Sequence, residues 1–126
     1  GSVHTRGSLS GAAPYTAAKQ GVHGLIQGLA VEFAARGLRF NVLSPGLCDT
    51  QIWQDIQHAA EDPEACRQHF RANIPVGRPG LPREIGAAAA FLASEKSRYT
   101  TGANLLVDGG MTSQIVSKES YASKPV

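Results

Sequence analysis

Residues 22–46 read VHGLIQGLAVEFAARGLRFNVLSPG, and this stretch decides the fold of the chain. Its first half places apolar residues at the spacing of a single helix face, and these are Val22, Leu25, Ile26, Leu29, Ala30 and Phe33. Gly37 follows as a natural helix end. Residues 38–44 are apolar and aromatic and stop at Pro45-Gly46, which predicts a strand that enters a loop. A helix followed directly by a strand favours an α/β fold.

The helix is expected to begin near Pro14, because proline is tolerated in the first turn of a helix. Three glycines, Gly21, Gly24 and Gly28, lie inside it. Each glycine costs roughly 1 kcal/mol relative to alanine in a helix interior. The pattern therefore predicts close helix-on-helix contact, either within the chain or across a dimer, in preference to a role in ligand binding.

Two helices are expected directly after the first strand. Residues 50–60 and 63–73 have helical composition, and Asp62 and Pro63 are typical of the start of the second helix. A carboxylate at the N-cap accepts hydrogen bonds from the free N–H groups of the first turn, and proline there loses no helical hydrogen bond.

The last part of the chain predicts one more helix and one more strand. Residues 83–94 are rich in alanine with apolar residues on one face, and residues 104–107 form an apolar run after the turn at Gly102. Residues 111–126 are mostly polar and show no sustained period. They indicate a loose tail or an arm that docks elsewhere.

Composition narrows the class of protein. The 126 residues are 42% hydrophobic and 17% charged, which is enough apolar material for one compact domain with a single core. The net charge of +2 comes from 12 basic and 10 acidic residues that form no run along the chain, so nucleic-acid binding is not expected. No apolar stretch approaches the roughly 20 residues of a membrane span, and the first residues lack the apolar part of a signal peptide.

The cysteines predict neither a metal site nor a disulfide framework. Cys48 and Cys66 form no C-x-x-C pair, and no cluster of His, Asp or Glu has the spacing of metal ligands. We therefore expect a cytoplasmic protein without a metal.

Tyr15 and Lys19 are the residues most suited to chemistry. They are four positions apart, which places them about 40° apart around a helix axis and roughly 6 Å along it. Continuing that face leads to the apolar series, so both side chains are expected to point to the buried side. A phenol ordinarily titrates near pH 10, and a neighbouring ammonium favours the phenolate, so such a pair can transfer a proton. The alternative is a tyrosine near the helix start with a solvated lysine.

Further residues lie at characteristic spacings around this pair. Ser2 is thirteen residues before Tyr15, and Asn41, Pro45-Gly46 and Thr50 follow the helix as N-x-x-x-P-G and a threonine. The later matching stretches are RPGLPREI at 78–85, FLAS at 91–94, TG at 101–102 and LVDGG at 106–110. Together these motifs resemble the short-chain dehydrogenase/reductase family over about 110 residues.

The resemblance implies that residues 1–110 are the C-terminal half of a Rossmann-like, doubly wound parallel sheet, followed by the tail at 111–126. It also implies hydride transfer between NAD or NADP and a carbonyl or alcohol carbon. Tyr15 would be the general acid/base, and Lys19 would lower its pKa and bind the nicotinamide ribose. Ser2 would hold the substrate oxygen. Gly-Ser is also a common remnant of tag cleavage, which would leave Ser2 without a role.

By the same resemblance, backbone groups near Leu47 and Cys48 and the hydroxyl of Thr50 would hold the nicotinamide carboxamide. The expected cofactor-binding residues are thus Tyr15, Lys19, Pro45, Gly46, Leu47, Cys48 and Thr50. Residues from about 50 to 75 would be the substrate lid, and its side chains that could contact a polar substrate are Trp53, His58, Arg67, His69 and Arg71. The alternative for the lid is an amphipathic helix pair with Trp53 and Phe70 packed inward and the charges in water.

The family's glycine-rich phosphate loop and its catalytic asparagine would lie before Gly1. We therefore expect activity to require an N-terminal half, which could be a separate chain, and this fragment alone to be inactive. A second hypothesis is a catalytically silent fragment or oligomerisation module of the same fold. A third is an epimerase that retains its cofactor. The glycine-lined helix and the resemblance together predict a homodimer or homotetramer that acts on a small alcohol or carbonyl substrate.

Overall fold

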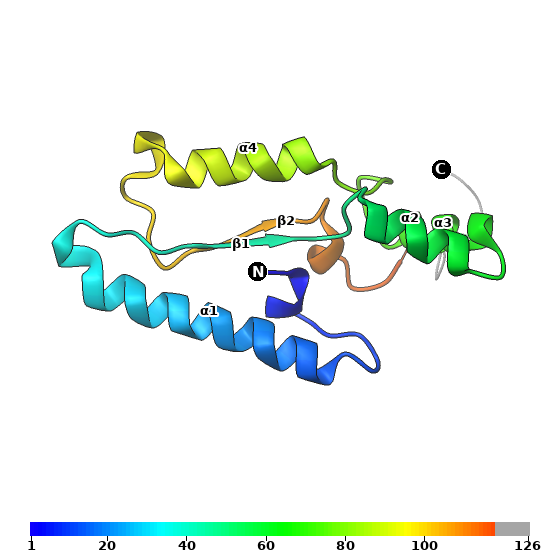
Figure 1. The fold of residues 1–126 in the computed structure, drawn as a ribbon, viewed down its shortest axis with the longest axis horizontal. Coiled ribbons are helices and arrows are strands. Elements are labelled where there is room, and N and C mark those ends of the chain that lie inside the picture. Colours follow the sequence, from blue (N-terminus) through cyan, green and yellow to red (C-terminus); the bar gives the residue numbers. More distant parts are fainter. Residues whose placement is uncertain (118–126) are drawn as a thin grey trace.

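The computed structural model describes residues 1–117 (Figure 1). Its helices and strands are α1 (Ala13–Phe33), β1 (Val42–Pro45), α2 (Gln51–Ala59), α3 (Pro63–Ala72), α4 (Pro82–Ala93) and β2 (Asn104–Val107). Four short 3-10 turns accompany them, η1 (Val3–Thr5), η2 (Ala34–Arg36), η3 (Glu95–Ser97) and η4 (Met111–Ser113). The expected order of helices and strands is confirmed.

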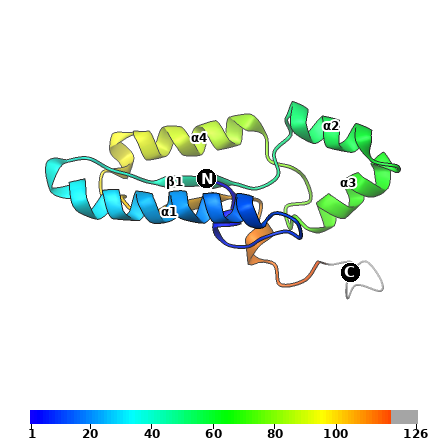
Figure 2. The ribbon, with the colours of Figure 1, turned by 60° about the horizontal axis from the view of Figure 1, so that its bottom comes forward.

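The two strands run parallel and lie between α1 and α4 in both views of the ribbon (Figures 1 and 2). Val42 pairs with Asn104 and Pro45 with Val107, so the strands are in register along their whole length. Parallel neighbours need a long crossover, and the chain from α2 to α4 provides it. The α/β class is therefore confirmed. The helices α2 and α3 lie beyond the carboxyl end of β1 (Figure 1).

Helix α1 begins and ends as its residues predict. Pro14 lies in its first turn, and Gly37 closes the following 3-10 turn with a φ of +78°. That dihedral is in the left-handed region, which glycine adopts without a steric penalty.

The apolar face of α1 differs from the expectation. Ala30 is buried, but Val22 and Leu25 are 44% and 61% exposed, so their predicted burial is wrong within residues 1–117. A Cβ added at any of the three helix glycines, Gly21, Gly24 and Gly28, would meet no atom within 4 Å. Helix-on-helix contact inside the described part of the chain is therefore also wrong. Contact across a dimer stays a prediction.

Strand β1 starts later than expected, at Val42 in place of residue 38. The reason lies opposite the strand, where residues 100–103 form a turn that cannot extend the ladder. Phe40 instead bonds to this turn, donating to Thr101 Oγ1 at 3.1 Å and accepting from the N–H of Gly102 at 2.7 Å. Pro45 was expected to follow the strand, but it is the last residue of β1. The ladder ends at Pro45, so the missing N–H of the proline costs no hydrogen bond.

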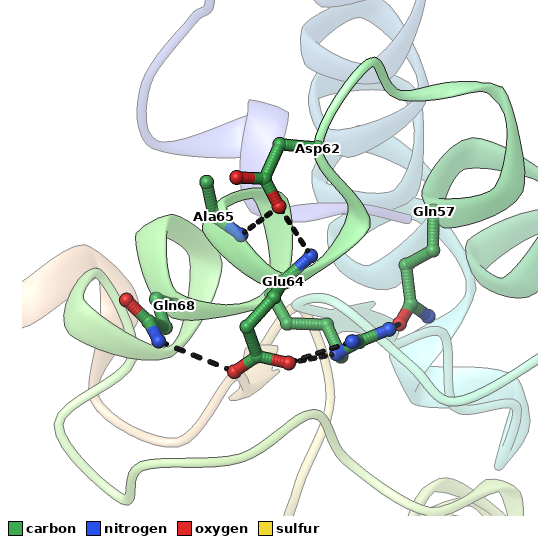
Figure 3. Close-up of polar contacts among 6 residues, drawn as sticks. Gln57, Asp62, Glu64, Ala65 and Gln68 are labelled. Carbon is green, nitrogen blue, oxygen red and sulfur yellow. Dashed lines mark hydrogen bonds and ion pairs between the residues drawn. The ribbon is translucent and has the colours of Figure 1, made fainter.

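The two helices expected after β1 form, and α3 has its predicted cap. The carboxylate of Asp62 accepts hydrogen bonds from the N–H groups of Glu64 and Ala65 at 2.9 and 3.0 Å (Figure 3). Trp53 of α2 is buried with its ring centroid 4.8 Å from that of Phe70 in α3. The inward packing of these two aromatic residues is therefore confirmed.

The core is thinner than the composition predicts. Among residues 1–117 the buried hydrophobic side chains are Ala30, Val42, Trp53 and Ile74. A sheet of two short strands covers little of the two helices beside it, which explains the difference. No helix in the described part of the chain is long and apolar enough to cross a membrane.

The expected tail begins as an ordered segment. It forms η4, and the Gln114 side chain donates to the carbonyl oxygen of Ala72 at 3.4 Å. The remainder of the expected tail, residues 118–126, lies outside the described residues.

Candidate active site

Tyr15 and Lys19 meet on the first turns of α1. The ammonium nitrogen of Lys19 lies 5.1 Å from the centroid of the Tyr15 ring, within the range of a cation–π contact. The shared helix face is therefore confirmed. Tyr15 is 49% exposed, so its expected orientation toward a buried side is wrong within residues 1–117. Half of the phenol is accessible to a ligand.

Ser2 is connected to Tyr15 through His4. Ser2 Oγ caps η1 by accepting from the N–H of His4 at 3.3 Å. The ring of buried His4 packs edge-on against the Tyr15 ring, with 4.9 Å between their centroids. His4 Nδ1 in turn lies 2.7 Å from Thr16 Oγ1. The turn that carries Ser2 is thus packed against the start of α1.

The sequence motifs assign no role to His4, so its contact with Tyr15 was not predicted. The available signal was its place two residues after Ser2, inside the segment that must approach Tyr15 if the serine and the tyrosine act together.

The N-terminal residue packs against β1. A Cβ added at Gly1 would lie 2.5 Å from Val42 Cγ1 and 2.6 Å from Ser44 Oγ. Only glycine fits at this distance, because real side-chain carbons do not approach other heavy atoms so closely. The close approach places Ser2 beside the strand whose carboxyl end leads to residues 45–50.

The loop after β1 is held tightly at two points. Gly46 donates its N–H to Val107 at 3.0 Å, and a Cβ there would lie 2.8 Å from Asp108 Cα. Beyond it, Gly80 donates to the carbonyl oxygen of Leu47 at 2.9 Å and accepts from the N–H of Asp49 at 2.8 Å. The backbone of residues 46–49 is therefore fixed on one side by these contacts.

The other side of this loop presents hydrogen-bonding groups that can take a ligand. The N–H groups of Leu47 and Cys48 form no hydrogen bond within residues 1–117. The hydroxyl of Thr50 is exposed and reaches only the carbonyl oxygen of Cys48, at 3.5 Å. Two N–H donors and a hydroxyl suit a carboxamide, which has both an acceptor and a donor. The residues present therefore fit the nicotinamide end of a dinucleotide.

The Cys48 thiol is not activated. Its sulfur lies 3.6 Å from the carbonyl oxygen of Gly46. Burial, and then the negative charge of Glu84, raise the pKa of the Cys48 thiol above its ordinary value. The thiolate, which would be the nucleophile, is disfavoured.

Arg78 and Glu84 support the loop from behind. The two guanidinium nitrogens of Arg78 donate to the two carboxylate oxygens of Glu84 at 2.9 and 2.7 Å. Glu84 also accepts from the N–H of Leu81 at 2.7 Å. These hydrogen bonds, that from Arg78 first, lower the pKa of Glu84 to about 2. Gly80 lies between Arg78 and Glu84 in the sequence and donates its N–H to the carbonyl oxygen of Leu47. The stretch at 78–85 therefore has a structural role that its motif alone did not reveal.

Of the arginine and histidine side chains that could contact a polar substrate in the predicted lid, some already have partners within the chain. Arg67 forms an ion pair with Glu64 at 2.6 Å and donates to Gln57 of α2 at 3.5 Å (Figure 3). It therefore links the two lid helices, and its guanidinium lowers the pKa of the Glu64 carboxyl through hydrogen bonding. His58 and His69 are exposed. Arg71 lines a cavity of about 190 Å³ beside Trp53.

Within residues 1–117 no group of three or more His, Cys, Asp or Glu side chains is placed to hold a metal ion.

Comparison with known proteins agrees with this geometry. A family model described as enoyl-(acyl carrier protein) reductase matches residues 1–112. The 3beta-hydroxysteroid dehydrogenase 1 of Eggerthella lenta is 46% identical over 100 residues, which are 79% of this chain and 37% of that protein.

Two solved structures illustrate the likeness. One from Agrobacterium tumefaciens with bound NADP is 39% identical with a TM-score of 0.72, over 79% of this chain and 39% of that one. A 4-hydroxyisoleucine dehydrogenase mutant, complexed with NADH and succinate, is 30% identical with a TM-score of 0.74, over 81% of this chain and 40% of that one.

The chain thus spans about two fifths of the length of these relatives. The match to the family model covers residues 1–112, so it includes Gly1 and Ser2 as well as the tyrosine and lysine of α1. The same ordered motifs, the parallel α/β fold and the match over residues 1–112 lead to one conclusion: the chain belongs to the short-chain dehydrogenase/reductase family.

Proposed function

We propose that the protein carrying this chain is an oxidoreductase that interconverts a carbonyl and an alcohol with NAD or NADP as cofactor. The observation that carries the proposal is the Lys19 ammonium nitrogen 5.1 Å from the centroid of a half-exposed Tyr15 ring. The exposed half of the phenol can reach a substrate oxygen, and a phenol hydroxyl can give and take a proton there. The printed names of the relatives, which are dehydrogenases and reductases, support this reaction class.

In the direction of reduction, the Tyr15 hydroxyl donates its proton to the substrate oxygen as that oxygen gains negative charge. The Ser2 hydroxyl donates a hydrogen bond to the same oxygen and so orients the carbonyl. Lys19 stabilises the phenolate that is left. The nicotinamide supplies the hydride to the carbonyl carbon when it is bound. In oxidation, the phenolate of Tyr15 accepts the proton of the alcohol.

The chain's own residues provide half of a cofactor site. The N–H groups of Leu47 and Cys48 and the hydroxyl of Thr50 bind the carboxamide, and Lys19 binds the nicotinamide ribose. Gly46 and Pro45 bring this loop to the end of the sheet, where ligands bind in open parallel sheets. The phosphate loop and the catalytic asparagine are assigned to an N-terminal half, on the same or a separate chain.

Residues from about 50 to 75 are assigned to the substrate lid. The cavity beside Trp53 and Arg71 lies between α2 and the C-terminal part of α3, so the lid has room for a small polar group there. The substrate class is a small alcohol or carbonyl compound.

The first test is cofactor binding by the protein expressed from its complete coding sequence. NADH and NADPH are titrated by fluorescence, and turnover is then followed at 340 nm with a panel of carbonyl substrates. Binding of one of them, with turnover that consumes it stoichiometrically, supports the proposal and excludes an epimerase. Binding of neither overturns it.

Failure to bind would favour the second candidate, an oligomerisation module without catalysis. The observation behind that candidate is the exposed glycine face of α1. Such a module would form a dimer or tetramer in solution while binding no cofactor. The fluorescence titration with NADH and NADPH therefore separates the two hypotheses.

A further inference from the structure

Three polar side chains form a closed cluster between η1 and the two strands. Ser44 of β1 is fully buried and Thr5 of η1 is 5% exposed, while Asn104 opens β2. Ser44 Oγ donates to Asn104 Oδ1 at 2.6 Å, and Asn104 Nδ2 donates to Thr5 Oγ1 at 2.8 Å. The Thr5 hydroxyl then lies 2.9 Å from the carbonyl oxygen of Ser2. The cluster ends on the backbone of the residue assigned to hold the substrate oxygen.

Counting protons fixes the direction of these hydrogen bonds. Ser44 and Thr5 have one hydroxyl proton each, and an amide oxygen can only accept. With the amide of Asn104 as described, the single proton of Thr5 has two acceptors within reach, the carbonyl oxygen of Ser2 at 2.9 Å and Ser44 Oγ at 3.2 Å, and Ser2 is the nearer. If the amide were reversed, its oxygen would face Thr5 and take that proton, and the carbonyl oxygen of Ser2 would keep only the backbone N–H of Thr5 as a donor. Only one orientation therefore satisfies all three residues and Ser2.

The carbonyl oxygen of Ser2 determines where its hydroxyl lies. It accepts from Thr5 twice, from the backbone N–H at 3.0 Å and from the side chain at 2.9 Å. These two bonds close the turn of η1, in which Ser2 Oγ receives the N–H of His4 and His4 packs on the Tyr15 ring. A change in the side-chain bond would therefore alter the placement of Ser2 relative to Tyr15.

We propose that Asn104, acting through Thr5, is a positioning residue for Ser2, an assignment that rests on the proposed function. Asn104 touches neither the substrate nor the cofactor. It belongs to the second strand and lies 99 positions from Thr5. Its amide orients the Thr5 hydroxyl toward Ser2, and the buried hydroxyl of Ser44 holds the amide in that orientation.

Nearly isosteric variants test the direction of the proton. In Asn104→Asp both carboxylate oxygens accept, so the carboxylate takes the Thr5 proton away from Ser2. Thr5→Val removes the hydroxyl, whereas Thr5→Ser retains it. Asn73→Asp makes the same chemical change at the C-terminal end of α3 and is the matched control, since within residues 1–117 the Asn73 side chain bonds to the carbonyl oxygen of His69 and not to this cluster.

The direct readout is the carbonyl carbon of Ser2 in the complete protein. Labelling with carbonyl-13C serine and 15N valine selects Ser-Val pairs, and residues 2 and 3 are the one such pair in the 126 residues. The Val3→Ile variant identifies the peak. We expect the 13C shift to move upfield in Thr5→Val and Asn104→Asp and to stay in place in Thr5→Ser and Asn73→Asp. An unmoved shift in Thr5→Val, with the fold intact by circular dichroism, overturns the proposal.

The second readout is kinetic. We expect kcat to fall roughly tenfold or more in Thr5→Val and Asn104→Asp, with the KM for cofactor within about twofold of the parent value. Thr5→Ser restores kcat. A shifted carbonyl peak with an unchanged kcat overturns the positioning role. A parent protein that reduces no carbonyl compound overturns the proposed function instead, and the carbonyl shift then still decides whether the hydrogen-bond chain exists.

Discussion

At the scale of single residues, the contacts of Tyr15 suit a proton donor that must meet its substrate from one side. Lys19 lies over its ring and His4 lies at its edge, and the remaining half of the side chain is exposed. Neighbours on two sides limit the rotation of the ring without covering it. The Thr16 and Ser8 hydroxyls, 2.7 Å apart, extend this support from His4 into the preceding loop.

Replacing Tyr15 with phenylalanine is expected to remove the proton donor while leaving the ring contacts with Lys19 and His4. Carbonyl reduction should fall by about 10²–10⁴-fold, the usual contribution of a general acid. The fluorescence titration with reduced cofactor should change little. Steady-state rates at saturating cofactor provide the measurement.

The control is Tyr99→Phe, because Tyr99 is fully exposed in the turn before β2. It should keep the parent rate. A Tyr15→Phe variant that retains more than half of the parent turnover would show that another group donates the proton.

The side-chain contacts of the candidate site could be predicted from the sequence only where the residues are close together in the chain. The spacing of Tyr15 and Lys19 indicates their contact because four residues are one helical turn. The amide of Asn104 has no such signal, since its partners lie in segments that meet only after the strands pair.

At the scale of elements, side-chain hydrogen bonds at the helix starts fix where α3 and α4 begin. Asp62 accepts two N–H groups at the start of α3, and Glu84 binds the backbone just before α4. The pKa of Glu84 is lowered in the folded protein, so the stability that Glu84 contributes depends on pH.

Asp62→Ala should destabilise the protein by about 1 kcal/mol, the usual cost of losing an N-cap. Two N–H groups of α3 would lose their acceptor, and the position of the lid helix would loosen. Urea unfolding followed by circular dichroism measures the change. The neighbouring Glu61→Ala variant, which removes an exposed carboxylate outside the cap, should have a midpoint near that of the parent, and equal midpoints for both variants would contradict the capping role.

Glu84→Gln should show a stability difference that depends on pH. The pKa of Glu84 in the folded protein is about 2, below its ordinary value of 4.5. A depressed carboxyl pKa contributes stability above the ordinary value, and this contribution is lost as the pH falls toward 2. The midpoints of parent and variant should therefore differ at pH 7 and converge between pH 4.5 and pH 2. Glu84 is exposed, so added salt should also reduce the difference.

The control for this measurement is Glu32→Gln, a substitution of an exposed glutamate on α1. Its effect should not change over the same pH range. A Glu84→Gln difference that stays constant from pH 7 to pH 2 would show that the ion pair with Arg78 does not lower the carboxyl pKa.

Helices and their caps could be predicted from the sequence because those signals are local. The bounds of α3 and β2 agree with expectation at Pro63 and over Asn104–Val107. The start of β1 could not be predicted from the sequence, because residues 38–41 have the composition of a strand and lack only a partner strand. A pairing partner belongs to the tertiary structure, and composition does not contain it.

At the scale of the whole molecule, the described part of the chain leaves one side of α1 open. Leu25 and Val31 are exposed large apolar residues, and the three glycines of the helix have no neighbour where a side chain would lie. The predicted homodimer or homotetramer would cover apolar surface of this kind. The periodicity predicted burial of Val22 and Leu25, which are exposed because the two strands of residues 1–117 are too few to bury them.

The predicted homodimer or homotetramer can be tested at Gly24. Gly24→Leu should favour the helix itself by roughly 1 kcal/mol, because leucine is a better helix former than glycine. In an interface that needs a close approach of two helices, the same side chain should lower the mass measured by light scattering toward that of a monomer. Glu61→Leu, which adds an equal side chain at an exposed site between α2 and α3, should leave the mass unchanged. A Gly24→Leu variant with the parent's mass would place the interface elsewhere.

The bond from Asn104 to Thr5 also orders events during synthesis of the protein. Thr5 leaves the ribosome first, and Asn104 follows 99 positions later. At the usual rate of translation that interval is about 5–20 s. Through this time the turn that carries Ser2 lacks the amide that orients it, and β1 lacks its parallel partner. A nascent chain therefore completes its catalytic turn only when the second strand has been translated.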